Sequence, residues 1–119
     1  DLGDLEFRRR KYNAGLAYRQ STQAVRMLTV AWAGRLDPER VTVNACHPGD
    51  VNSALSNSLG FGGHDTPDQA ARTPVWLAAD PTVARQTGRY FEHQRPVLCR
   101  FGADTAAVEA LYQACMAYG

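Results

Sequence analysis

Tyr18 and Thr22 are the residues whose types and spacing first suggest chemistry. They lie four positions apart in the string Tyr18-Arg19-Gln20-Ser21-Thr22. Residues four apart share one face of a helix, so the two side chains project together if this stretch is helical. A tyrosine hydroxyl can exchange a proton with a substrate oxygen. A free phenol has a pKa of about 10, however, and needs a nearby positive charge to act near neutrality, which Thr22 does not supply.

The periodicity of the sequence predicts one long helix over residues 14–36 that would carry this pair. Apolar and small side chains recur there at three- and four-residue steps. Asp37-Pro38 should end the helix, because the residue before a proline is pushed out of the helical region. The β-branched stretch 40–46 then precedes Pro48-Gly49, as expected of a buried strand. A helix that leads into a strand indicates an α/β fold.

The rest of the chain continues this alternation. Thr66 has the character of a helix N-cap with Pro67 at the first helical position, and Asp80-Pro81 should end that helix. The two predicted strands lie about 40 residues apart, which suits a parallel pair joined by a crossover. The elements predicted here are a loop over residues 50–65 with a short helix near 53–59, a helix over 66–79, a strand over 88–91 and a helix over 103–118.

Charge and composition disfavour several classes of function. Thirteen basic against twelve acidic side chains leave a formal charge of +1, so no strong field would draw the chain onto nucleic acid. No apolar run approaches the ~20 residues that span a bilayer. The cysteines are odd in number, which fits reduced thiols in a cytoplasmic protein, and neither cysteines nor histidines have metal-like spacing. These residues are Cys46, Cys99, Cys115, His47, His64 and His93.

Several motifs, in order and spacing, resemble the C-terminal half of the short-chain dehydrogenase/reductase family, in its retinol-dehydrogenase-like branch. The helix of that family carries Tyr-x-x-Ser-Lys, which Tyr18, Ser21 and Thr22 follow except at the last position. The other similar segments are a strand with a Pro-Gly-x-Val-x-Thr-like turn at residues 41–53, the next helix at 66–78 and the last strand at 88–91. The resemblance covers nearly the whole chain.

The resemblance implies a fold larger than this chain. The expected fold class is α/β, the C-terminal part of a Rossmann-like doubly wound parallel sheet in the order helix-strand-loop-helix-strand-helix. Residues 1–119 would form a single partial domain that lacks the N-terminal dinucleotide-binding half. Neither the family's glycine-rich turn after a strand nor a serine upstream of Tyr18 is found in the sequence.

By the same resemblance, the function is an NAD(P)-dependent oxidoreductase acting on a small carbonyl or alcohol. Tyr18 would be the catalytic acid/base. The residues expected beside the cofactor, NADP or NAD, are Thr22, Pro48, Gly49, Val51 and Ser53. The chain alone is expected to be inactive and to bind the cofactor weakly, because half of the site is missing and Thr22 replaces the lysine.

Two alternatives follow from the same residues. Loss of the lysine favours a non-catalytic descendant that serves as an association module, with the helix 14–36 as the surface of a homo-oligomer. A small helical binding module with the arginine-rich segment 8–11 as its arm would require the resemblance to be accidental, and salt-dependent oligonucleotide affinity would test it.

Overall fold

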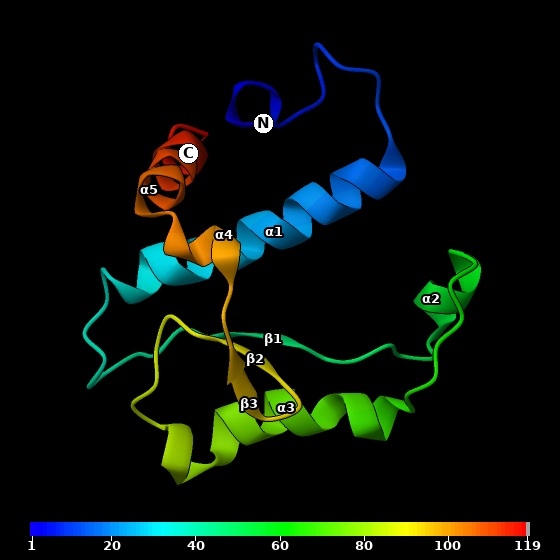
Figure 1. Cartoon of the computed structure of the whole chain (residues 1–119). Helices are drawn as coiled ribbons and strands as arrows, with labels where there is room; N and C mark the ends of the chain where they lie inside the picture. Colours follow the sequence, from blue (N-terminus) through cyan, green and yellow to red (C-terminus); the bar gives the residue numbers. More distant parts are fainter. Residues whose placement is uncertain (119) are drawn as a thin grey trace.

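The computed structural model describes residues 1–118, in which helices and short strands alternate (Figure 1). The helices are α1 (Ala14–Ala33), α2 (Ala54–Ser58), α3 (Pro67–Ala79), α4 (Arg100–Ala103) and α5 (Thr105–Met116), with 3-10 turns η1 (Leu2–Asp4) and η2 (Pro81–Val83). The strands are β1 (Ala45–His47), β2 (Tyr90–Glu92) and β3 (Arg95–Val97).

Side-chain caps set where the two main helices begin. The amide oxygen of Asn13 accepts a hydrogen bond from the backbone N–H of Leu16 at 2.8 Å, which satisfies one of the free donors at the start of α1. Thr66 and Gln69 form a reciprocal capping box at the start of α3, as the sequence predicted for Thr66. Gly34 caps the end of α1, so this helix is shorter than the predicted range 14–36.

The sheet has the order β1-β2-β3, and the predicted parallel pairing is present. β1 and β2 are parallel, with Ala45 opposite Tyr90. Residues 40–44 of the predicted strand 40–46 have irregular backbone instead, because hydrogen bonds to side chains replace backbone hydrogen bonds of the sheet before β1. The backbone N–H of Val43 donates to Thr87 Oγ1 at 3.0 Å, and Asn44 Nδ2 donates to the carbonyl of Gln86 at 2.6 Å.

The third strand corrects the predicted element order, which contained two strands. β3 pairs antiparallel with β2 through a tight turn at His93 and Gln94. Both turn residues have positive φ, 47° and 60°, a conformation that usually selects Gly or Asn. β3 also contains Pro96, and proline is tolerated only at a sheet edge. The local sequence therefore carries no ordinary hairpin signal.

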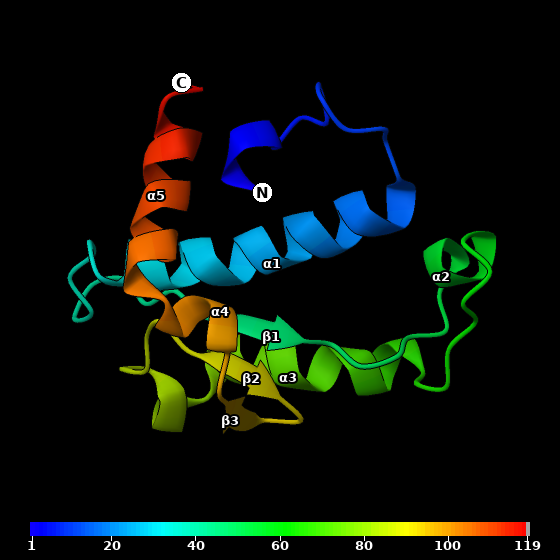
Figure 2. The ribbon, with the colours of Figure 1, turned by 45° about the horizontal axis from the view of Figure 1, so that its top comes forward.

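Helices cover both faces of the sheet. Figure 2 shows α1 above the strands, α3 behind them, and α5 rising from one end of α1. The main core cluster lies between α1 and α5 and contains Met27, Ala31, Val108 and Leu111. On the other face, the ring of Trp76 packs edge-on against the fully buried Phe91, with ring centroids 5.6 Å apart. α1 is thus held between the sheet and α5.

The chain exposes more surface than a compact protein of its size. Its accessible surface is 8377 Å², whereas about 6,400 Å² is expected for a compact chain of this mass. The radius of gyration is 15.8 Å, against about 13.5 Å expected. Within residues 1–118, β1 pairs with a strand along one side only. None of the described helices is long and apolar enough to cross a bilayer.

Candidate functional site

Tyr18 lies on the exposed side of α1, and 64% of its surface is accessible to solvent. Its backbone carbonyl accepts hydrogen bonds from two hydroxyls further along the helix, Ser21 Oγ at 2.9 Å and Thr22 Oγ1 at 2.8 Å. The Thr22 hydroxyl is therefore engaged with the helix backbone. Its proton points to a carbonyl and leaves only lone pairs for a ligand.

A cleft of about 680 Å³ lies between α1 and the carboxyl end of β1. It brings together four of the six residues that the sequence singled out: Tyr18, Thr22, Pro48 and Gly49. Ligands of parallel α/β sheets bind beyond the carboxyl ends of the strands, and this cleft has that location.

The other two predicted residues, Val51 and Ser53, lie outside the lining of this cleft. The hydroxyl of Ser53 caps α2 by accepting from the backbone N–H of Ser56 at 3.1 Å, and Ser56 Oγ accepts from the N–H of Ser53 in return. Ser56 Oγ also donates to the carbonyl of Val51 at 2.7 Å. These bonds order the start of α2.

The turn after β1 requires a glycine. Gly49 has φ 103°, in the region that favours glycine, and a Cβ there would collide with the carboxylate of Asp65. That carboxylate accepts the backbone N–H of Asp50 at 2.9 Å. Asp65 therefore fixes the turn beside the cleft from the far end of the loop.

Arg26 and Tyr90 add a cation and a phenol to the same cleft. The guanidinium of Arg26 lies over the ring of Tyr90, 4.2 Å from its centroid. Burial raises the pKa of Tyr90 to about 12, and the nearby Glu92 adds to the rise. Within residues 1–118 the buried hydroxyl of Tyr90 has no partner with hydrogen-bond geometry, not even Glu92. This pair was not predicted from the sequence, because no local sequence pattern links residue 26 to residue 90.

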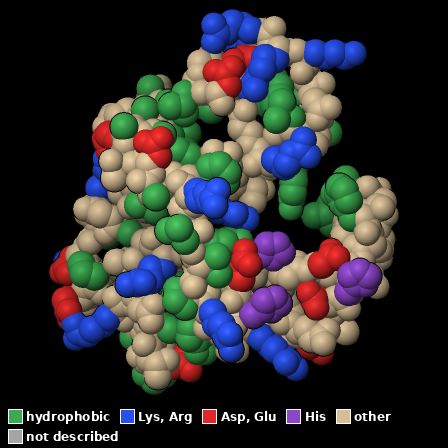
Figure 3. All heavy atoms as spheres, in the orientation of Figure 1, with side chains coloured by type: hydrophobic (Ala, Val, Ile, Leu, Met, Phe, Trp, Pro, Cys, Tyr) green, Lys and Arg blue, Asp and Glu red, His purple; other side chains and the backbone are tan. Residues whose placement is uncertain are grey.

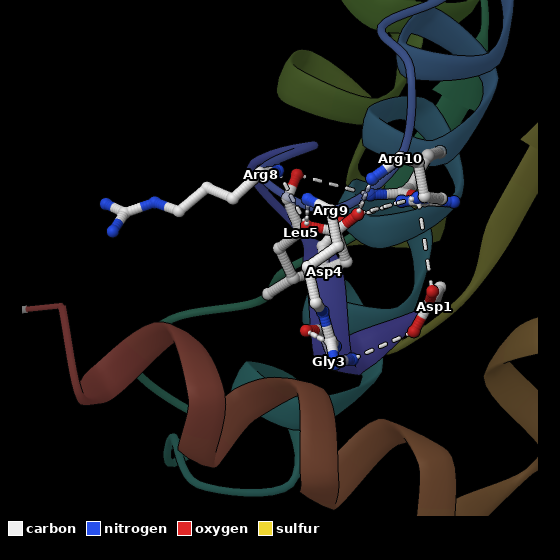
Figure 4. Close-up of polar contacts among 8 residues, drawn as sticks. Asp1, Gly3, Asp4, Leu5, Arg8, Arg9 and Arg10 are labelled. Atoms are coloured by element: carbon white, nitrogen blue, oxygen red, sulfur yellow. Dashed lines mark hydrogen bonds and ion pairs between the residues drawn. The ribbon is translucent and has the colours of Figure 1, made fainter.

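The arginine-rich N-terminal segment also reaches the cleft, through Arg10. Figure 4 shows the buried carboxylate of Asp4 at its centre, which accepts backbone N–H bonds from Arg8, Arg9 and Arg10 at 2.7, 3.2 and 3.0 Å. Burial tends to raise the pKa of the Asp4 carboxyl, but these bonds outweigh it and hold the pKa below its usual value. Arg10 Nη2 donates to Gln20 Oε1 at 2.9 Å, which ties the segment to α1.

Comparison with known proteins places the chain in a family. The chain is 33% identical over 107 residues to human retinol dehydrogenase 13, covering 77% of this chain and 32% of the relative. It is 37% identical over 110 residues to a probable oxidoreductase of Streptomyces antibioticus, covering 77% and 37%. It is 36% identical over 102 residues to a putative daunorubicin C-13 ketoreductase of a Streptomyces species (strain C5), covering 80% and 35%.

The chain is a relative of the retinol-dehydrogenase-like short-chain dehydrogenases/reductases. It spans about a third of the length of the family members that it matches. No protein-family model matches the chain, and no solved structure matches it significantly.

One thiol also lies in the cleft of this short-chain dehydrogenase/reductase relative. Cys46 lines the cleft, and burial raises the pKa of its thiol, so the uncharged form is favoured. No cluster of three or more metal-ligating side chains occurs in the part of the chain that the structure describes.

Proposed function

We propose that this chain forms the tyrosine side of the active site of an NAD(P)-dependent short-chain dehydrogenase/reductase that interconverts a carbonyl and an alcohol. The observation that carries the proposal is the common cleft of Tyr18 and the Pro48-Gly49 turn at the carboxyl end of β1. Retinol dehydrogenases and a ketoreductase among the relatives support the reaction class.

The residues present fit the nicotinamide end of such a cofactor. The cleft is large enough for a planar ring, and the Pro48-Gly49 turn forms part of its lining. When bound, the cofactor would donate or accept a hydride. Tyr18 would hold the proton that is exchanged with the substrate oxygen. Thr22 would contribute lone pairs. Val51 and Ser53 lie outside the lining of the cleft, so they would contact only a part of the cofactor that extends beyond it along the loop 50–65.

We also propose that the complete site requires further sequence, which would supply the dinucleotide-binding half of a Rossmann-like doubly wound domain. Two observations on residues 1–118 support this proposal: one side of β1 pairs with no strand there, and the exposed surface is roughly 2,000 Å² above that of a compact chain. By this account the chain alone is inactive and binds NADP or NAD weakly.

The substrate that we propose is a small apolar carbonyl or alcohol. Leu16, Val25 and Phe101 give the cleft apolar walls. The name of one relative mentions retinol, which is a largely apolar alcohol. Reduced cysteines, expected of a cytoplasmic protein, are compatible with this role, since all three thiols are unpaired within residues 1–118.

The test begins with the chain by itself, titrated with NADPH and NADH while cofactor fluorescence and thermal melting are followed. We expect weak binding and little rise in the melting temperature when cofactor is added. The chain is then joined to the upstream half of a retinol dehydrogenase, and ketone reduction is measured. Tyr18→Phe should abolish turnover. Thr22→Lys should raise it by about 10²-fold or more, because a lysine supplies the missing charge. Full turnover in Tyr18→Phe would contradict the proposed role of Tyr18.

A second candidate function is association, with α1 as the contact surface of a homo-oligomer. Leu16, Val25 and Trp32 on α1 are exposed by 38%, 59% and 41%. The neutral Thr22 also favours a helix that no longer serves catalysis. Sedimentation of the chain and of Val25→Asp would distinguish the two functions. A dimer that Val25→Asp dissociates would support association, and a monomer over the working concentration range would exclude it.

A further inference from the structure

A second, smaller pocket of about 250 Å³ lies on the α3 side of the sheet. It is built at the carboxyl ends of both parallel strands, since His47 is the last residue of β1 and His93 follows β2 directly. Figure 3 shows histidine side chains gathered on this side of the molecule among acidic and basic ones. The remaining lining residues are Pro48, Asp65, Gln69, Arg72, Thr73 and Gln94.

The tautomer of His47 makes it a donor toward a ligand. Its Nδ1 accepts a hydrogen bond from the backbone N–H of Gly49 at 2.8 Å. A ring nitrogen that accepts carries no proton, so the neutral imidazole holds its proton on Nε2. His47 therefore has an Nε2–H group that can donate a hydrogen bond to a ligand.

The turn that carries His93 is held in a costly conformation. His93 and Gln94 both have positive φ without being Gly or Asn. The backbone N–H of Gln94 donates to the buried Thr73 hydroxyl at 3.2 Å, which fixes the turn against α3. Backbone strain of this kind is concentrated at functional sites, where the surrounding structure maintains it. Here it holds His93 at the rim of the pocket.

Arg72 provides a charge that the protein itself leaves unmatched. Arg72 takes part in none of the ion pairs found within residues 1–118, although Asp65 lines the same pocket. Asp65 instead directs a carboxylate oxygen to the N–H of Asp50. Side chains that can donate hydrogen bonds thus line the same pocket as one guanidinium, and they come from β1, from α3 and from the turn after β2. Such a lining suits an anion with several oxygens.

We propose that this pocket binds a small oxyanion, the phosphate or carboxylate group of a ligand. Arg72 supplies the charge, while His47, His93 and Gln69 supply N–H donors. His47 and Pro48 line both this pocket and the larger cleft, but Tyr18 takes no part in this pocket, so phosphate binding can be tested without oxidoreductase activity.

Inorganic phosphate is the probe for the first experiment. It is titrated into the chain while the imidazole signals are followed by NMR and the heat of binding by calorimetry. We expect saturable shifts of the His47 and His93 signals. His64, which lies outside the lining of the pocket and 4.0 Å from Asp50, is the internal reference. Phenyl phosphate in a second arm distinguishes an esterified group, which would bind more tightly, from free phosphate.

Arg72→Met should weaken phosphate binding about tenfold or more, since a charge-assisted hydrogen bond is lost. The matched control is Arg89→Met, which removes the same charge at the opposite end of β2. Binding should survive in the control and in Tyr18→Phe. The proposal is overturned if phosphate does not saturate the signals, if His64 shifts as much as His47, or if Arg89→Met weakens binding as much as Arg72→Met.

Discussion

Replacing Tyr90 with phenylalanine tests the buried hydroxyl beneath the cleft. Tyr90 is only 6% exposed, and within residues 1–118 its hydroxyl lacks a hydrogen-bond partner. A buried hydroxyl without a partner costs about 1–3 kcal/mol. Tyr90→Phe removes this cost and keeps the ring against Arg26. We therefore expect the free energy of unfolding at neutral pH to rise by about 1 kcal/mol, whereas loss of a satisfied hydroxyl would lower it.

Alkaline pH should widen this difference. The pKa of Tyr90 is about 12 in the folded chain, against about 10 in an unfolded chain. When the pKa of a group is higher in the folded than in the unfolded chain, the group's contribution to the free energy of unfolding is complete at pH values below the unfolded pKa. That contribution is lost as the pH rises through the folded pKa. By about pH 11 the native chain should lose about 1.4 kcal/mol that Tyr90→Phe retains.

The assay is urea unfolding followed by circular dichroism, at about pH 7 and about pH 11. Tyr118→Phe is the matched control, because Tyr118 is 62% exposed and its loss should change stability by less than about 0.5 kcal/mol. A loss of about 1 kcal/mol or more in Tyr90→Phe at neutral pH would refute the reasoning, since the hydroxyl would then have a partner.

Three further predictions concern the core, the N-terminal segment and the turn after β1. Leu111→Ala should lower the free energy of unfolding by about 2–4 kcal/mol, because Leu111 is buried between α1 and α5. Leu55→Ala, at an exposed site, should change it little, and urea unfolding measures both variants. The ionised Asp4 carboxylate stabilises its segment at pH values above the usual carboxyl pKa, and this contribution is lost as pH falls through the lowered pKa. Proteolysis at Arg8–Arg10 should therefore accelerate in acid, and Asp4→Asn should show the faster rate already at neutral pH. Gly49→Ala should cost about 1–3 kcal/mol and disorder the turn, measured by urea unfolding and by the NMR signal of Asp50 N–H.

Much of the fold could be predicted where the signal is local. The caps at Asn13 and Thr66 set helix starts that periodicity and turn chemistry already indicate. The parallel pairing of β1 with β2 follows from the length of the connection. β3 was missed because a turn through His93 and Gln94 offers no glycine signal and tertiary contact with Thr73 stabilises it.

The candidate site was predictable only in part, for the same reason. Tyr18, Thr22, Pro48 and Gly49 lie in motifs with short spacing, and these four line one cleft. The stacking of Arg26 on a ring 64 positions away depends on how α1 lies across the sheet, which no local pattern encodes.

The two faces of α1 have different roles. Tyr18, Thr22 and Arg26 face the cleft, whereas Met27 and Ala31 belong to the packed core against α5. Substitutions at position 22 should therefore change the stability of the fold little, whereas substitutions at position 31 should lower it. Evolution or laboratory selection can therefore change the cleft through this exposed stripe of α1 without rebuilding the core.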